Sequence, residues 1–118
     1  MSSTTPANQK LPDYWEHPDT HIAENLHAEL QRELPPGHLL FGVPVETFAW
    51  TGHGSDDILF RWLDVPDRFT IIHLSWLGRA EINAKHPTVE FDGSFADFLA
   101  YHEQLITFLR DVPKRRDA

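Results

Sequence analysis

The chain has 118 residues and no cysteine, so it is long enough for one domain with a buried core, and disulfides, thiolate metal sites and a cysteine nucleophile are excluded. Its 18 acidic and 10 basic residues give a formal net charge of −8, which disfavours nucleic acid and anionic membranes and favours a basic protein partner. No apolar run approaches the roughly 20 residues that span a bilayer, and the polar N-terminus lacks the apolar core of a secretory signal. We therefore expect a cytoplasmic protein.

The N-terminal part of the chain predicts a flexible tail followed by an amphipathic helix. Residues 1–12 are polar and proline-bearing, which is typical of a tail. From 21 to 34 the apolar residues recur at helical spacing, and Asp19 or Thr20 can accept the free N–H groups of the first turn. The polar side of this helix, expected to face solvent, comprises Glu24, Asn25, Glu29, Gln31, Arg32 and Glu33.

Four strands are predicted after this helix, and they form an antiparallel sheet. The third is apolar at both alternating sets of positions, so both of its faces should be buried and it should lie inside the sheet. We therefore expect both faces of the sheet to be covered, one by at least one helix, and a homodimer partner is one candidate to cover the other. The predicted strands are 39–50, 56–63, 68–78 and 88–91.

A second helix should follow the last strand. Ser94 and Asp97 have the spacing of a capping box, and apolar residues then recur at three- and four-residue intervals as far as Leu109. Pro113 should end this helix and leave a basic tail over 113–118. The chain therefore predicts a single α+β domain over 13–112, with a sheet of about four antiparallel strands flanked by an N-terminal and a C-terminal helix.

Eight histidines are the most unusual feature of the composition. They are dispersed and lack local metal-ligand spacings, so we expect no metal site and no cofactor. His73 lies in the apolar third strand, where it is expected to be a core histidine bonded to a carbonyl or a buried carboxylate. In the alternative interpretation it is a general base oriented by Glu81 or Asp92.

Aromatic and acidic residues together indicate an interface. Phe48 and Trp50 in the first strand, with Phe60 and Trp62 in the second, could stack as cross-strand pairs whose surface stays partly exposed. An exposed aromatic patch rimmed by acid is typical of a protein interface. The candidate binding residues are Trp50, Asp56, Asp57, Trp62 and Trp76.

The segment 72–81, which reads Ile-His-Leu-Ser-Trp-Leu-Gly-Arg-Ala-Glu, resembles the core motif of a small uncharacterised bacterial family. That motif has the form His-Leu-Thr-Trp-x-Gly-x-x-Glu and is followed by a strand containing Pro-Thr and a terminal helix. The resemblance covers about half of the chain, and Ser75 replaces the usual threonine. It implies a bacterial origin and a compact α+β fold but no activity. The motif residues to test for function are His73, Trp76, Gly78 and Glu81. A structural role is the equal alternative, in which Trp76 packs in the core, Gly78 forms a tight turn after the strand and Glu81 is a hydrogen-bond partner.

The leading hypothesis from the sequence is a non-enzymatic protein-binding module, like an immunity protein or an accessory subunit. Its exposed acids, such as Asp56 and Asp57, would bind a basic partner. The alternative is a small hydrolase-type enzyme that uses His73 with Glu81, which requires both side chains to reach one accessible pocket. A homodimer with a purely structural role is the third possibility.

Overall fold

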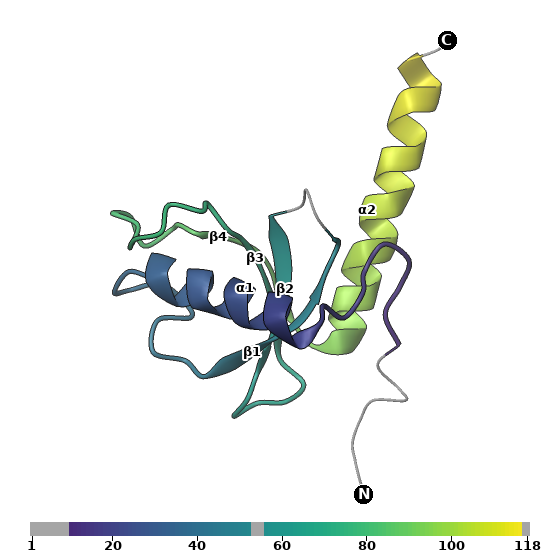
Figure 1. The fold of residues 1–118 in the computed structure, drawn as a ribbon. Helices are drawn as coiled ribbons and strands as arrows, with labels where there is room; N and C mark the ends of the chain where they lie inside the picture. Colours follow the sequence, from purple (N-terminus) through teal and green to yellow (C-terminus); the bar gives the residue numbers. More distant parts are fainter. Residues whose placement is uncertain (1–9, 53–55, 117–118) are drawn as a thin grey trace, which may run out of the picture.

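A computed structural model of the protein describes residues 10–52 and 56–116, and within them the chain forms two helices and one four-stranded antiparallel sheet in the order β1-β2-β3-β4 (Figure 1). This confirms the predicted α+β class with one helix before the sheet and one after it. Most of the predicted N-terminal tail, residues 1–9, and the hairpin tip, residues 53–55, lie outside the described residues. The elements are α1 (Thr20–Glu33), β1 (Val45–Trp50), β2 (Asp57–Trp62), β3 (Phe69–His73), β4 (Thr88–Gly93) and α2 (Phe95–Arg116).

Helix α1 lies across one face of the sheet (Figure 1). It begins as predicted, because the Asp19 carboxylate accepts a hydrogen bond from the Ile22 amide at 2.9 Å. Its leucines are buried against the strands and form a continuous apolar core with them. The buried residues of this core are Leu26, Leu30, Leu34, Leu40, Val45, Trp50, Ile58, Phe60, Ile72 and Leu74.

The first turns of α2 cover the opposite face, and the rest of the helix projects beyond the sheet (Figure 1). Ser94 and Asp97 form the predicted capping box, in which the Asp97 amide donates to the Ser94 hydroxyl and the Ser94 amide donates to the Asp97 carboxylate. Phe95 packs edge-on against Phe69 with ring centroids 5.3 Å apart. Helix α2 therefore covers the face for which a homodimer partner had been predicted, which removes the reason for expecting one there.

Two predicted strands were too long. β1 begins at Val45 because the preceding residues turn, with Gly42 at a φ of +77°. β3 ends at His73 instead of continuing to residue 78, because the chain then enters the left-handed region at Trp76 (φ 59°) and at Gly78 (φ 74°).

Helix α2 continues past its predicted end. Pro113 was expected to stop it, yet the helix reaches Arg116. Proline removes only one backbone hydrogen bond so near the terminus. No helix in the described part of the chain combines the length and the apolarity needed to cross a membrane.

A bulge in each edge strand changes which side chains share a face. In β1, Thr47 is opposite Phe60 and Ala49 is opposite Leu59, so Phe48 is an extra residue. Phe48 therefore packs on the α2 side while Trp50 is buried on the α1 side, and the predicted exposed pairing of these aromatics is wrong. In β4, Glu90 is the extra residue in the same way, between the partners of Ile71 and Ile72.

Phe98→Ala should destabilise the protein by about 3–5 kcal/mol, because Phe98 is fully buried between α2 and the sheet. Leu105→Ala is a matched control on the same helix, since Leu105 is 41% exposed, and should change stability by less than about 0.5 kcal/mol. Urea unfolding of both variants measures the difference. Equal losses would show that α2 does not cover this face as described.

Candidate functional site

Two buried carboxyl groups of α1 bind the backbone that follows β3. The Glu33 side chain accepts hydrogen bonds from the amides of Ser75 at 2.9 Å and Trp76 at 2.6 Å, and Glu29 accepts one from the Gly78 amide at 3.0 Å. We call Glu29 and Glu33 the carboxylate clamp and residues 74–81 the exit loop. The two side chains are 3% and 0% exposed, so the prediction that they face solvent is wrong.

The clamp residues differ in how readily each loses its proton. Burial and the adjacent Glu29 carboxyl group raise the pKa of Glu33 above its ordinary value. For Glu29, burial acts in the same direction but is outweighed by hydrogen bonds with Glu33, with the Gly78 amide and with Arg32, so its pKa is lowered. Glu33 is therefore the member of the pair that keeps a proton to higher pH.

The motif residues Ser75 and Glu81 complete this attachment. The Ser75 hydroxyl lies between the carboxyl groups of Glu33 and Glu81 and is hydrogen-bonded to both. The Glu81 amide donates to the Glu33 carbonyl at 3.0 Å. Glu81 thus has the role of a hydrogen-bond partner that the resemblance implied, and its side chain contacts Ser75, whereas His73 contacts Asp57.

Trp76 projects from the exit loop and is 48% exposed, so the packing role expected for it is wrong. Its φ of 59° is costly for any residue with a Cβ, by roughly 1–2 kcal/mol. Two contacts hold it in place: its amide donates to Glu33, and its indole N–H donates to Asp56 at 2.9 Å. The chain therefore fixes a large aromatic side chain in a strained, exposed position.

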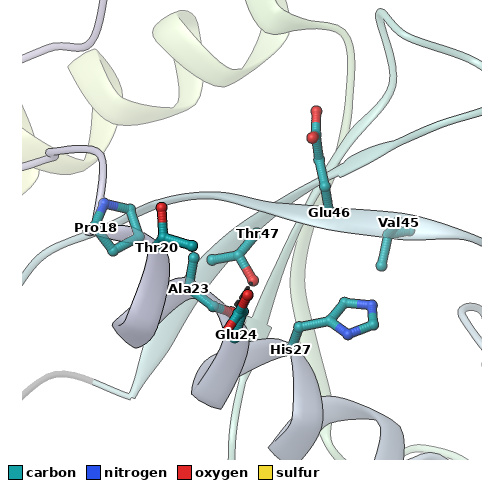
Figure 2. A pocket seen from close by; sticks show the side chains of 8 residues that line it. All are labelled: Pro18, Thr20, Ala23, Glu24, His27, Val45, Glu46 and Thr47. Atoms are coloured by element: carbon teal, nitrogen blue, oxygen red, sulfur yellow. Dashed lines mark hydrogen bonds between the residues drawn. The ribbon is translucent and has the colours of Figure 1, made fainter.

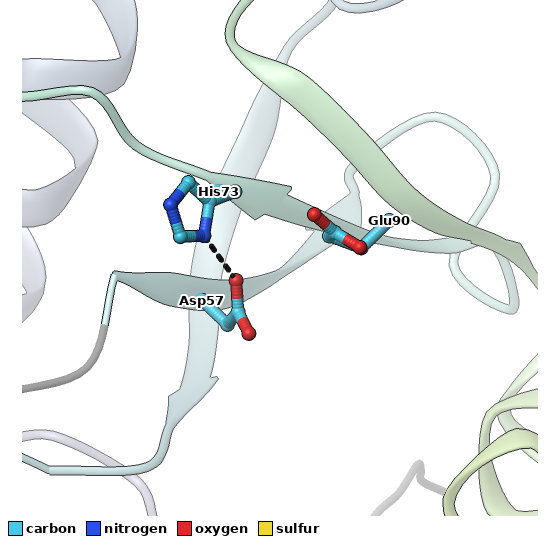
Figure 3. Close-up of side chains that lie close together, drawn as sticks. All are labelled: Asp57, His73 and Glu90. Atoms are coloured by element: carbon cyan, nitrogen blue, oxygen red, sulfur yellow. Dashed lines mark hydrogen bonds and ion pairs between the residues drawn. The ribbon is translucent and has the colours of Figure 1, made fainter. Parts of the chain in front are cut away.

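His73 lies beside Trp76 at the end of β3 and is not a core residue. Its side chain is 49% exposed, and its Nδ1 is 2.8 Å from Asp57 (Figure 3). Its Nε2 is 3.9 Å from Asp56. The hydrogen bond to Asp57, followed by the negative charges of Asp57, Asp56 and Glu90, raises the pKa of His73, although its slight burial opposes this.

We call these five residues, Asp56, Asp57, His73, Trp76 and Glu90, the acidic aromatic face. Four of them are the candidate site residues Asp56, Asp57, His73 and Trp76, and Glu90 joins them through the β4 bulge. The other two candidate tryptophans lie elsewhere. Trp50 is buried in the α1-side core, and Trp62 is half-buried, donates its indole N–H to Thr70 at 2.9 Å and stacks under Arg68.

Two cavities lie away from this face. One, of about 390 Å³, lies between α1 and β1, where Glu24 lies beside Thr47 and the His27 ring points toward Val45 (Figure 2). The other, of about 340 Å³, lies between Tyr14 and the His102 side of α2. Neither is lined by His73 or Glu81, so neither is the common pocket that the enzyme hypothesis requires.

Glu33→Ala should destabilise the protein by about 1–3 kcal/mol, because it leaves the partly buried amides of Ser75 and Trp76 without their acceptor. Glu24→Ala, an exposed position on the same helix, should change stability by less than about 0.5 kcal/mol. Denaturant unfolding compares the two. A Glu33→Ala variant as stable as Glu24→Ala would refute the clamp.

The clamp should also give stability a specific pH dependence. Because the pKa of Glu33 is raised in the folded state, its proton stabilises the fold fully below the unfolded value of 4.5, and this contribution is lost as pH rises through the folded pKa. The stability of the wild type relative to Glu33→Gln should therefore fall from pH 4.5 upward, as measured by unfolding at several pH values. A relative stability that rises with pH would contradict this assignment.

No protein-family model, curated protein or solved structure matches this chain. The resemblance to a bacterial family therefore stays a prediction, and a function has to be argued from the site itself.

Proposed function

We propose that the protein is a non-enzymatic binding module whose acidic aromatic face docks a basic segment of another protein, in the manner of an immunity protein or an accessory subunit. The observation that carries the proposal is Trp76, which is half-exposed and held at positive φ. Strained residues whose surroundings hold them in place are concentrated at functional sites.

A glycine at position 76 would relieve the backbone strain there, yet the chain has tryptophan. Glycine adopts positive φ without penalty, as Gly78 does two residues later. Keeping tryptophan at position 76 instead leaves a large apolar surface beside Leu77, which is also exposed. Tryptophan is the residue type most enriched at the energetic centres of protein interfaces, so its exposure supports a docking role.

The charges around Trp76 indicate the chemistry of the partner. Asp56, Asp57 and Glu90 place three carboxylates around one histidine on this face. An arginine of the partner could pair with one of these carboxylates through two hydrogen bonds and stack on the Trp76 ring. A segment rich in arginine or lysine with one apolar anchor is therefore the partner that fits best.

One observation favours the hydrolase alternative, namely the 2.8 Å contact between His73 Nδ1 and the Asp57 carboxylate. In such an enzyme Asp57 would take the orienting role predicted for Glu81. His73 lines neither of the two cavities described above, so neither of them supplies a substrate site beside this base. The binding proposal is better supported, because it requires only the exposed surface.

Trp76→Gly should weaken partner binding by about 2 kcal/mol or more, as expected of an interface hot spot. It should leave the fold intact, because the backbone amide that binds Glu33 remains and the strain at φ 59° is relieved. Tyr14→Gly is a matched control, since Tyr14 is also an exposed aromatic residue with positive φ, but it lies at the second cavity.

The measurement begins with affinity capture from a lysate of the source organism on immobilised wild type, Trp76→Gly and Tyr14→Gly. A protein that the wild type and Tyr14→Gly retain and Trp76→Gly loses is purified and titrated by calorimetry. The double variant Asp56→Asn, Asp57→Asn should weaken this binding, and the loss of affinity should be larger at low salt than at high salt. Identical captured proteins on all three baits would refute the proposal.

A further inference from the structure

Three strands bring potential metal ligands together on one face of the sheet. Asp57 of β2, His73 of β3 and Glu90 of β4 each offer one ligand atom, and these atoms all lie within 4.8 Å of one another (Figure 3). Asp57 and His73 are direct partners in the antiparallel register. Glu90 joins them because it is the extra residue of the β4 bulge, and bulges commonly redirect a side chain toward a site.

The surroundings of the His73 ring resemble those of a metal-bound histidine, in which further residues hydrogen-bond to the ligand. A metal-bound histidine usually donates its other ring N–H to a carboxylate, which is itself hydrogen-bonded. Here Nδ1 is 2.8 Å from Asp57, while Nε2 is 3.9 Å from Asp56. Asp56 in turn accepts the indole N–H of Trp76 at 2.9 Å. The chain of contacts from Trp76 through Asp56 to His73 would orient the ring for a ligand at Nδ1.

From this geometry we infer that Asp57, His73 and Glu90 form a binding site for a divalent transition-metal ion, with Zn²⁺ as the representative ion. One imidazole and two carboxylates are a ligand set that Zn²⁺ accepts, with water at the fourth position, whereas Mg²⁺ and Ca²⁺ prefer oxygen ligands alone. Ligands of a tetrahedral zinc lie roughly 3.3 Å apart, as follows from bonds of about 2.0 Å. The exposed side chains of His73 and Glu90 can make the small adjustment required.

Binding would use the neutral imidazole with its proton on Nε2. The ion takes the position of the proton between His73 Nδ1 and Asp57, and any proton displaced from the ring passes to the solvent. Besides Asp56, Tyr101 of α2 is near the site, and its pKa is raised first by burial and then by the charges of Glu90 and Asp57. A divalent ion would neutralise the charge of those two carboxylates.

The test is isothermal titration of the full, tag-free chain with ZnCl₂. Wild type should bind one Zn²⁺ at a saturable site, and His73→Ala and Glu90→Gln should lose that site. Asp56→Asn, which changes only the outer contact, should weaken binding about 10–100-fold. His21→Ala is the matched control, because it removes an exposed histidine on α1 and should leave the site intact.

A second readout separates the site from loss of folding or from binding at other histidines. Zn²⁺ should shift the NMR resonances of the His73 ring and the Trp76 indole N–H, and MgCl₂ in excess should not. Far-ultraviolet circular dichroism confirms that each variant is folded, and Glu90→Gln, an exposed change, keeps the test valid if His73→Ala unfolds. The inference is overturned if no saturable site is found or if Glu90→Gln binds as tightly as wild type. Because no partner is present, the result is independent of the proposed function.

Discussion

The arrangement of the molecule depends on hydrogen bonds from exit-loop amides to two buried carboxyl groups of α1. Without Glu29 and Glu33, the amides of Ser75, Trp76 and Gly78 would lose their acceptors as the chain leaves the sheet. A buried carboxyl group is itself unfavourable unless it receives such donors. Loop and helix therefore require each other, and this mutual requirement fixes the end of β3, the strained backbone of Trp76 and the position of the acidic aromatic face.

Elements whose determinants are local in sequence could be predicted. The Asp19 cap, the Ser94 and Asp97 capping box and the apolar spacing of both helices depend on residues a few positions apart, and each is present. The first three strands lie side by side in chain order, as short connections favour. Local sequence patterns were therefore sufficient for the fold class.

Features that depend on distant partners could not be predicted. Glu29 and Glu33 have the periodicity of solvent-facing residues, and only donors 42 to 49 positions away show that they are buried. The bulge at Phe48 separates it from Trp50, and the bulge at Glu90 adds a third carboxylate to the face, yet no proline or glycine stands at either irregular position. His73 was placed inside the core because the strand was expected to continue past it.

The site that results combines two properties in one small area. Trp76 supplies an exposed apolar surface, and the carboxylates around His73 supply negative charge and metal-ligand chemistry. Asp56 connects the two, since it accepts the Trp76 indole N–H and lies beside the His73 ring. A substitution of Trp76 should therefore alter the surroundings of His73, and a substitution of His73 should alter those of Trp76. Unrelated surface residues would not be coupled in this way.

Amide hydrogen exchange of the exit loop, followed by NMR, tests the central claim most directly. If the carboxylate clamp holds the loop, the amides of Ser75 and Trp76 will exchange slowly, like those of the β3 core, although they lie outside any strand. The neighbouring Arg79 amide, on an exposed residue, provides the comparison within the same loop. Exchange of Ser75 and Trp76 as fast as that of Arg79 would contradict the account and with it the fixed position of Trp76.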